Sequence, residues 1–199
     1  MRCSAAQNRW FTAPTIAADE RTEPPIFLKA NTCVIGPDDP IAIPRWSNDV
    51  VFEGELAIVI KSLAKDVSVE DAPQMILGYT IANDATARDA MTGGPWSRGK
   101  SFDSACPLGP WITVDPALDV TNLAIRSYLN GEIAQDSSTA HMIWNPFELV
   151  SYVSHQMTLL PGDVIATGAP AGAQVVHAGD RVEIEIEGIG RLTNPVVRA

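Results

Sequence analysis

The segment from Val50 to Ile60 carries two carboxylates one residue apart, Glu53 and Glu55, at the start of a strongly apolar run. The branched side chains of 56–60 predict a strand that is covered on both faces. Because side chains alternate along a strand, Glu53 and Glu55 point to the same side, and Gly54 leaves the opposite side open. Two like charges held together in this way would share a proton unless a cation lies between them. The pair therefore raises the hypothesis of a divalent metal site.

The same alternation occurs in a second acidic segment, 182–188, which contains Glu183, Glu185 and Glu187. We interpret these three side chains as the solvated face of an exposed sheet. By spacing alone, two glutamates at the start of a strand are more typical of a wet sheet edge than of a metal site. The metal hypothesis therefore needs support from other residues.

Asp84 offers such support, because it ends a short predicted strand that begins at Gly78. An aspartate there can cap the following turn, or it can complete a cage of three carboxylates around a hard cation. Arg88 lies one helical turn further on, which predicts that it faces the same side. Lys100 lies in a loop rich in Gly and Pro, the kind of segment that carries chemistry on a rigid scaffold. Either cation could instead be a surface salt-bridge partner.

Many short apolar runs, separated by 15 prolines and 14 glycines, predict a mainly β chain with a few short helices, an α+β fold. One helix is expected over 72–77, after the cap-like sequence 68–71. A second is expected to begin at Asn145-Pro146 and to run towards Met157.

The predicted strands that follow include a hairpin, in which 124–129 and 132–136 flank a type I′ turn at Asn130-Gly131. The segment 31–48 is expected to be a long surface connection. Three further strands are expected near the C-terminus, over 164–167, 181–187 and 191–197.

Length and charge narrow the class of protein. The 199 residues and 46% apolar content fit one globular domain with a substantial core. The net charge of −10 argues against nucleic acids and anionic membranes as partners, because both require a basic face. The sequence contains no apolar run of about 20 residues and no secretory pattern, so we expect a cytoplasmic protein. The scattered cysteines Cys3, Cys33 and Cys106 are expected to serve packing.

With these features in place, the chain resembles the fumarylacetoacetate hydrolase family over roughly residues 22 to 197, above all its small acylpyruvase and 2-hydroxyhepta-2,4-diene-1,7-dioate isomerase-like members. The matching motifs are Phe27-Leu-Lys29, Val34-Ile-Gly-Pro37, Ile43-Pro-Arg45, Phe52-Glu-Gly-Glu-Leu56, Gly78-Tyr-Thr-Ile-Ala-Asn-Asp84, Ala87-Arg-Asp89, Arg98-Gly-Lys-Ser-Phe-Asp103, Cys106-Pro-Leu-Gly-Pro110, Asn130-Gly131, Asp136-Ser-Ser-Thr139 and Leu160-Pro-Gly-Asp163.

The resemblance implies a mixed β roll of the family's C-terminal domain type, a homodimer, and Mg²⁺ or Mn²⁺ as cofactor. It implies that Glu53, Glu55 and Asp84 bind the metal, that Arg88 and Lys100 bind a small oxo-acid substrate, and that Lys100 is catalytic. It also implies a catalytic domain over 22–199, preceded by a divergent N-terminal or lid segment, 1–21. The implied activity is Mg²⁺-dependent hydrolysis of a carbon–carbon bond in an acylpyruvate or another β-diketo acid, through a metal-chelated enolate.

Several positions depart from the family pattern. Thr12 and Thr15 occupy the places where many small members carry a His and a Glu that activate the hydrolytic water, and a hydroxyl is no base near neutral pH. Ala169 replaces a threonine, and His141 replaces an acidic residue. His141 could be a substitute base or an ordinary surface or packed residue. These departures leave open an oxo-acid decarboxylase, a keto–enol isomerase, or a paralogue that binds metal and ligand with little catalysis.

Overall fold

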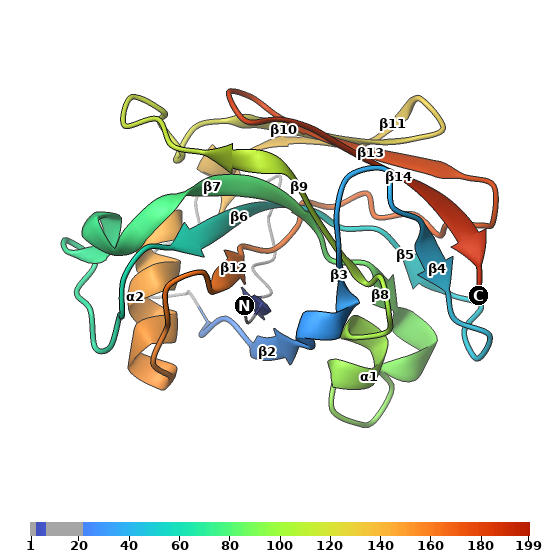
Figure 1. The fold of residues 1–199 in the computed structure, drawn as a ribbon, viewed down its shortest axis with the longest axis horizontal. Helices are drawn as coiled ribbons and strands as arrows, with labels where there is room; N and C mark the ends of the chain where they lie inside the picture. The colour runs from blue at the N-terminus through green and yellow to red at the C-terminus, as the bar shows by residue number, and fades with distance from the viewer. Residues whose placement is uncertain (1–2, 7–21) are drawn as a thin grey trace.

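The computed structural model describes residues 3–6 and 22–199, and in this part of the chain most of the regular structure is β (Figure 1). Thr12 and Thr15, which the sequence analysis places at the family's His and Glu positions, lie outside these described residues. Both kinds of strand pair occur: β1 (Cys3–Ala6) pairs parallel with β12 (Val164–Ala166), and β6 (Gly54–Ile60) pairs antiparallel with β7 (Ile76–Asn83). The expectation of a mainly β fold with short helices and a mixed, curled sheet is thus confirmed.

A sheet of seven strands is the frame of the molecule. Its order is β2 (Ile26–Lys29), β1 (Cys3–Ala6), β12 (Val164–Ala166), β6 (Gly54–Ile60), β7 (Ile76–Asn83), β9 (Cys106–Thr113) and β3 (Val34–Ile35). A second sheet has the order β11 (Glu132–Ser138), β10 (Ala124–Leu129), β13 (Arg181–Ile186), β14 (Gly190–Arg198) and β4 (Ile41–Ile43). The short strands β5 (Val50–Val51) and β8 (Thr86–Ala87) pair with each other.

The described helices are short. They are α1 (Ser97–Lys100), α2 (Pro146–Gln156) and the 3₁₀ turns η2 (Asn31–Cys33), η3 (Ala72–Met75), η4 (Arg88–Ala90) and η5 (Thr139–His141). No helix in the described residues is long and apolar enough to span a membrane.

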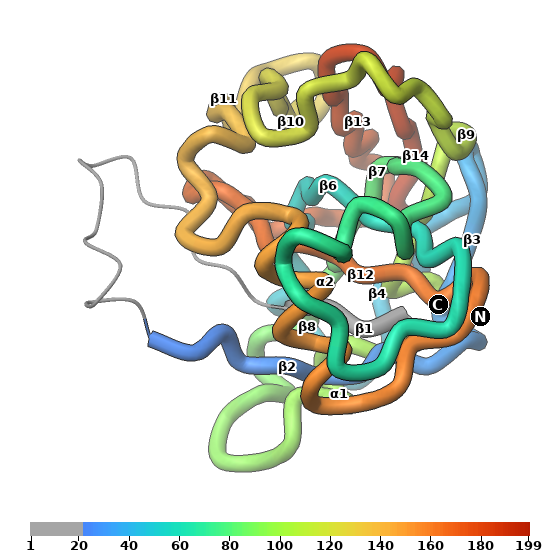
Figure 2. Tube along the Cα trace, turned by 90° about the vertical axis from the view of Figure 1, so that its left-hand side faces the viewer, coloured from blue at the N-terminus to red at the C-terminus, as the bar shows by residue number. Residues whose placement is uncertain are grey.

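The two large sheets form layers, with β10, β11, β13 and β14 on one side of β6 and β7, and β2 and α1 on the other (Figures 1 and 2). One hydrophobic cluster joins Leu56 and Ile81 of the first sheet to Ile125 and Ile184 of the second. β6 thus lies inside the molecule, and every one of its residues is buried. The prediction of a strand covered on both faces is confirmed.

Gly54 has a specific role where β6 passes β10. A Cβ atom at this position would lie 2.3 Å from Ser127 Oγ and 3.0 Å from Ile184 Cγ2. The side opposite the two glutamates is therefore filled by the second sheet and leaves room only for glycine.

Helix α2 begins as predicted, with a complete capping box. The Asn145 side chain accepts hydrogen bonds from the backbone N–H groups of Phe147 and Glu148, and Glu148 Oε2 accepts one from the Asn145 N–H at 2.7 Å. Its apolar face, which includes Val150 and Val153, packs on the strands of the first sheet.

The predicted hairpin is also confirmed. Asn130 and Gly131 have φ values of 53° and 87°, as a type I′ turn requires at both central positions. The three C-terminal strands lie within one residue of their predicted bounds.

Two predicted elements are wrong. The helix expected over 72–77 is only the turn η3, because Ile76 and Leu77 already pair within β7. The segment 31–48 is no surface connection, since it contains β3, β4 and the buried side chains of Cys33, Ile41 and Ile43. Tertiary pairing draws the end of the first stretch and parts of the second into strands in spite of their turn-rich composition.

Candidate metal centre

The pairing of β6 with β7 brings three carboxylates together. Gly54 lies opposite Asn83 in this antiparallel ladder. Glu53, which precedes Gly54, and Asp84, which comes after Asn83, therefore lie at the same end of the two strands. The Asp84 N–H donates to the Glu53 carbonyl oxygen at 2.9 Å and fixes this end. One ligand atom from each of Glu53, Glu55 and Asp84 lies within 4.8 Å of the others. The three oxygens can therefore contact one common ion.

Two carboxylates of the trio are buried, and the third is partly exposed. Glu55 and Asp84 are 2% and 1% exposed. The Glu53 side chain is 20% exposed, so solvent reaches the trio from that side.

Two lysines neutralise part of this negative charge. Lys100, the last residue of α1, places its Nζ 2.7 Å from Glu53 Oε2 and 2.5 Å from Asp84 Oδ2. Lys29, the last residue of β2, places its Nζ 2.6 Å from Asp84 Oδ1. When all three carboxylates are ionised, they carry one more negative charge than the two ammonium groups balance, which favours binding of a further cation.

Polar groups around the trio hold the carboxylates in place. The Gly168 N–H donates to Glu55 Oε2 at 2.7 Å. The Thr86 hydroxyl lies within hydrogen-bonding distance of Glu53 Oε2, at 3.0 Å, and of the Asp84 carbonyl oxygen, at 2.8 Å. Outer partners of this kind orient the ligands of metal sites.

The charges shift the pKa values of these groups in opposite directions. Burial, together with the negative charges of Asp84 and Glu53, raises the pKa of Glu55 well above its usual range. Burial also acts to raise the pKa of Asp84, but the two lysines outweigh it and the pKa is lowered. Burial acts to lower the pKa of Lys100, but Asp84 and Glu53 outweigh it and keep the pKa above its ordinary value. A divalent cation in contact with Glu55 would favour its ionised form.

The donor set fits a hard divalent cation. Carboxylate oxygens are the ligands that Mg²⁺ and Mn²⁺ prefer, and three protein oxygens leave further positions for water and substrate. The aromatic ring of Phe27 lies 4.9 Å from Lys100 Nζ and closes one side of the site.

The structure brings four of the five predicted site residues together, namely Glu53, Glu55, Asp84 and Lys100. Arg88 is the first residue of η4, directly after β8, and its guanidinium binds Asp49, with Nη2 2.6 Å from Oδ1 and 51% of its side chain exposed. Sequence reasoning missed Lys29 as a site residue. A lysine that directly follows the apolar run 26–28 was the available signal, since lysine is rarely buried without a partner.

Two of the departures from the family pattern, His141 and Ala169, fall on described residues. His141 is exposed on η5, with its Nδ1 3.2 Å from Ser137 Oγ, which is the surface placement expected of an ordinary histidine. Ala169 is the next residue after Gly168, whose N–H donates a hydrogen bond to Glu55.

The family model described as fumarylacetoacetate (FAA) hydrolase, C-terminal, matches residues 3–197. This chain belongs to the fumarylacetoacetate hydrolase family. Members of the family that are similar to this chain include hydrolases, isomerases and tautomerases. Together with the acidic trio, which could hold a metal ion, the family membership indicates a metal-dependent enzyme.

Three similar proteins of this family illustrate the range. The mitochondrial oxaloacetate tautomerase fahd2 of Xenopus laevis is 43% identical over 186 residues, and the match covers 88% of this chain and 58% of that protein. The crystal structure of 2-hydroxyhepta-2,4-diene-1,7-dioate isomerase from Mycobacterium marinum is 46% identical, with a TM-score of 0.91 over 99% of this chain and 74% of that one. The crystal structure of maleylpyruvate hydrolase from Sphingobium sp. SYK-6, in complex with manganese(II) and pyruvate, is 31% identical, with a TM-score of 0.86 over 100% of this chain and 70% of that one.

Proposed function

We propose that this protein is a Mg²⁺- or Mn²⁺-dependent enzyme that interconverts keto and enol isomers of a small 2-oxo acid. The observation that carries the proposal is the contact of one buried ammonium group, Lys100, with two carboxylates of a trio that can hold one cation. In this proposal Glu53, Glu55 and Asp84 are the metal ligands.

When bound, the cation supplies a Lewis acid that polarises the carbonyl group of the oxo acid. Lys100 supplies the proton chemistry beside it. Because its pKa lies above the ordinary value, Nζ holds its proton at neutral pH and can donate to the oxygen or carbon on which negative charge develops. Its position 2.7 Å from Glu53, the most exposed member of the trio, supports a donor on the side from which a substrate would approach.

Isomerisation matches the groups available in the described residues. Ketonisation of an enol balances on one such group, because Lys100 Nζ, in contact with the trio, can give its proton to the substrate carbon and regain one from the enol hydroxyl, with no water consumed. Hydrolysis needs in addition a base that activates water, and neither Thr12 nor Thr15 offers one near neutral pH. The tautomerase and the isomerase, at 43% and 46% identity, support the same choice.

Hydrolysis of an acylpyruvate is the second candidate. It is supported by the maleylpyruvate hydrolase, whose structure holds manganese(II) and the 2-oxo acid pyruvate. Both reactions pass through the enolate of a 2-oxo acid, so both require the acidic trio and Lys100. Arg88 would then hold the distal end of the substrate after exchanging its partner Asp49.

The test is turnover by the purified protein with Mg²⁺ or Mn²⁺. Tautomerisation of oxaloacetate, its decarboxylation, and cleavage of acetylpyruvate and fumarylpyruvate are followed separately, with Asp84→Asn as the inactive control. We expect metal-dependent tautomerisation. Cleavage of an acylpyruvate without tautomerisation would select the hydrolase, and release of CO₂ alone would select a decarboxylase. Calorimetric binding of oxalate with Mg²⁺, without turnover of any oxo acid, would select the binding paralogue.

We also propose that the enzyme is a homodimer, as the family resemblance implies. Two large apolar side chains at the end of β9, Trp111 and Val114, are 62% and 66% exposed and could be covered by a second copy. Sedimentation analysis that finds only monomers at micromolar concentration would contradict this proposal.

A further inference from the structure

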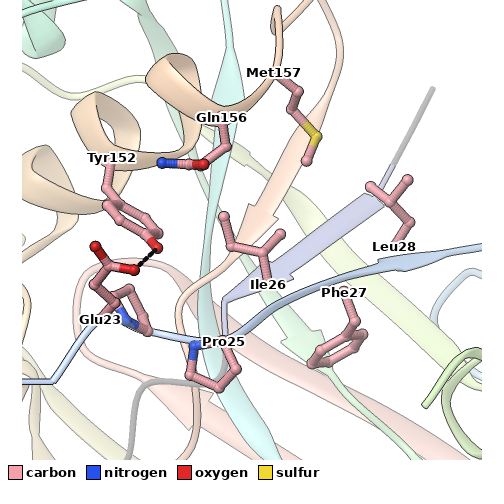
Figure 3. A pocket seen from close by; sticks show the side chains of 9 residues that line it. Glu23, Pro25, Ile26, Phe27, Leu28, Tyr152, Gln156 and Met157 are labelled. Atoms are coloured by element: carbon pink, nitrogen blue, oxygen red, sulfur yellow. Dashed lines mark hydrogen bonds between the residues drawn. The ribbon is translucent and has the colours of Figure 1, made fainter. Parts of the chain in front are cut away.

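Lys29 reaches the centre from the edge of the first sheet. Figure 3 shows Ile26 and Leu28 on one side of β2, towards the groove beside α2, and Phe27 on the opposite side. Lys29 follows Phe27 by two residues and shares its face. The side chain is therefore directed inward, and the residue is 3% exposed.

The ammonium group of Lys29 makes two contacts that connect separate parts of the centre. It lies 2.6 Å from Asp84 Oδ1, and it donates a hydrogen bond to the backbone carbonyl oxygen of Lys100. The other Asp84 oxygen, Oδ2, lies 2.5 Å from Lys100 Nζ. Each oxygen of this carboxylate is thus held by a different ammonium group, which fixes its rotation.

The two lysines occupy different places relative to the trio. Lys100 bonds Glu53 and Asp84 together, so it lies in the space between two prospective ligands. Lys29 bonds only Asp84 within the trio, and its second partner is a main-chain atom. An arriving cation therefore competes with Lys100 for carboxylate oxygens and leaves the contacts of Lys29 in place.

We propose that Lys29 is a positioning residue that fixes both the Asp84 carboxylate and the backbone from which the Lys100 side chain extends. The inference rests on the proposed metal site at the trio. One ammonium group would thus set a ligand and the proton-carrying lysine relative to each other, although they are separated along the chain by 16 residues.

The residues around Lys29 restrict the movement of its ammonium group. Cys33 and Cys106 are both buried next to it, and a hydrogen bond with Cys106 followed by burial raises the pKa of Cys33. A neutral Cys33 thiol does not compete with Asp84 for the ammonium group. Lys29 is accordingly enclosed by groups that hold it to one orientation.

The proposal is tested on Lys29→Met, with Lys65→Met as the matched control. Lys65 also pairs with an aspartate, Asp66, but at the surface, with 43% of its side chain exposed. Mn²⁺ affinity is measured by calorimetry and by the spin-resonance signal of free Mn²⁺. We expect Lys29→Met to bind Mn²⁺ about 10- to 100-fold more weakly, as found when outer partners of metal ligands are removed. Lys65→Met should bind as the wild type does.

The outcomes separate this inference from the proposed function. If the wild type binds no Mn²⁺, the metal site itself is refuted, and the role of Lys29 falls with it. If the wild type binds and Lys29→Met binds equally well or more tightly, only the positioning role is refuted, even if the variant melts earlier. At saturating Mn²⁺, a positioning role also predicts a lower kcat at nearly unchanged KM, because Lys100 is displaced.

If Lys29→Met does not fold, the variant Lys29→Arg tests the proposal instead. Arginine keeps the charge, but its planar fork cannot reproduce the two contacts of a single Nζ. We expect Lys29→Arg to bind Mn²⁺ at least about 10-fold more weakly than the wild type. Wild-type affinity and kcat in this variant would show that any nearby positive charge suffices and would overturn the proposal.

Discussion

Two segments of this protein have the same alternation of glutamates, one at β6 and one in β13. Glu53 and Glu183 are even similarly exposed, at 20% and 18% of the side chain. Their partners differ. Glu53 binds Lys100, which is 1% exposed, whereas Glu183 lies near Arg181 and Arg191, which are 57% and 45% exposed.

The second glutamate of each segment shows the contrast most clearly. Burial raises the pKa of Glu55, while a hydrogen bond from Arg191 lowers the pKa of Glu185. The neighbouring layers cause this difference, because both faces of β6 are buried whereas β13 has only one buried face. Equal spacing therefore leads to a candidate metal centre in one strand and to solvated ion pairs in the other.

Asp84→Asn should have the largest effect, because it removes one of three prospective ligands and leaves Lys29 and Lys100 without a shared anion. We expect Mn²⁺ affinity to fall by more than about 100-fold and turnover to be lost with it. Glu185→Gln, in the exposed segment, should change both by less than about twofold. Equal losses in the two variants, measured by calorimetry and oxaloacetate tautomerisation, would remove the distinction between the segments.

Lys100→Met should lower kcat by about 10²- to 10⁴-fold, the usual contribution of a proton-transfer group. Mn²⁺ binding should persist and become tighter, because the competing ammonium group is gone from Glu53 and Asp84. Steady-state kinetics and calorimetry on the same preparation separate the two effects. Loss of Mn²⁺ binding together with activity would mean that Lys100 supports the site and does not compete with the ion.

Gly54→Ala should destabilise the fold by about 1–3 kcal/mol, because its methyl group would overlap Ser127 Oγ. The Ser127 hydroxyl has no hydrogen-bond partner among the described atoms, so Ser127→Ala alone should cost little. The double variant should recover most of the lost stability in thermal melts. A double variant that is as unstable as Gly54→Ala would mean that another contact excludes the side chain.

The two segments should respond to pH with opposite signs. The pKa of Glu55 is raised in the folded protein, so its contribution to stability is present at low pH and is lost as the pH rises through the folded pKa. Metal-free Glu55→Gln should accordingly be more stable than the wild type at neutral pH, and added Mn²⁺ should reverse the order.

Glu185 supplies the control for this measurement. Its lowered pKa gives stability that is present above the unfolded pKa and is lost as the pH falls through the folded value. Because its side chain is 42% exposed, Glu185→Gln should cost less than about 1 kcal/mol at neutral pH and nothing in acid. The measurement is denaturant titration of the metal-free proteins across the pH range. If the contrast were wrong, the difference in unfolding free energy from the wild type would change with pH in the same direction for both variants.

Arg191→Ala should have the smallest effect. Its bond to Glu185 at 2.8 Å joins two side chains that are each more than two-fifths exposed, at 45% and 42%. We expect a loss below about 1 kcal/mol that disappears in high salt, measured by denaturant unfolding. A loss of several kcal/mol would mean that ion pairs on this face stabilise the fold as buried ones do.

The sequence predicted the elements whose signals are local. The helix start at Asn145-Pro146 and the turn at Asn130-Gly131 involve neighbours along the chain, and both formed as expected. The helix expected after Asp71 did not form, because Ile76 pairs with Ile60 of β6. This partner is distant along the chain, and local sequence signals do not indicate the pairing. The strands within 31–48 were missed for the same reason.

The candidate site was predictable only in part. Glu53 and Glu55 could be placed on one side from alternation, and Asp84 at a strand end, but only the family resemblance joined them. The apolar run before Lys29 indicated that this lysine is buried, but its partner is 55 residues away, so the local pattern did not show that it joins the site. Arg88 could be placed near the site, yet its pairing with Asp49 depends on a loop whose path the sequence does not specify.

Anomalous diffraction from crystals grown with Mn²⁺ tests most directly whether three acidic side chains share one cation. A single strong peak should appear in bonding contact with oxygens of Glu53, Glu55 and Asp84, with Lys100 Nζ moved away from at least one of them. A peak elsewhere, or none while Lys100 keeps both of its carboxylate contacts, would contradict the assignment of this centre.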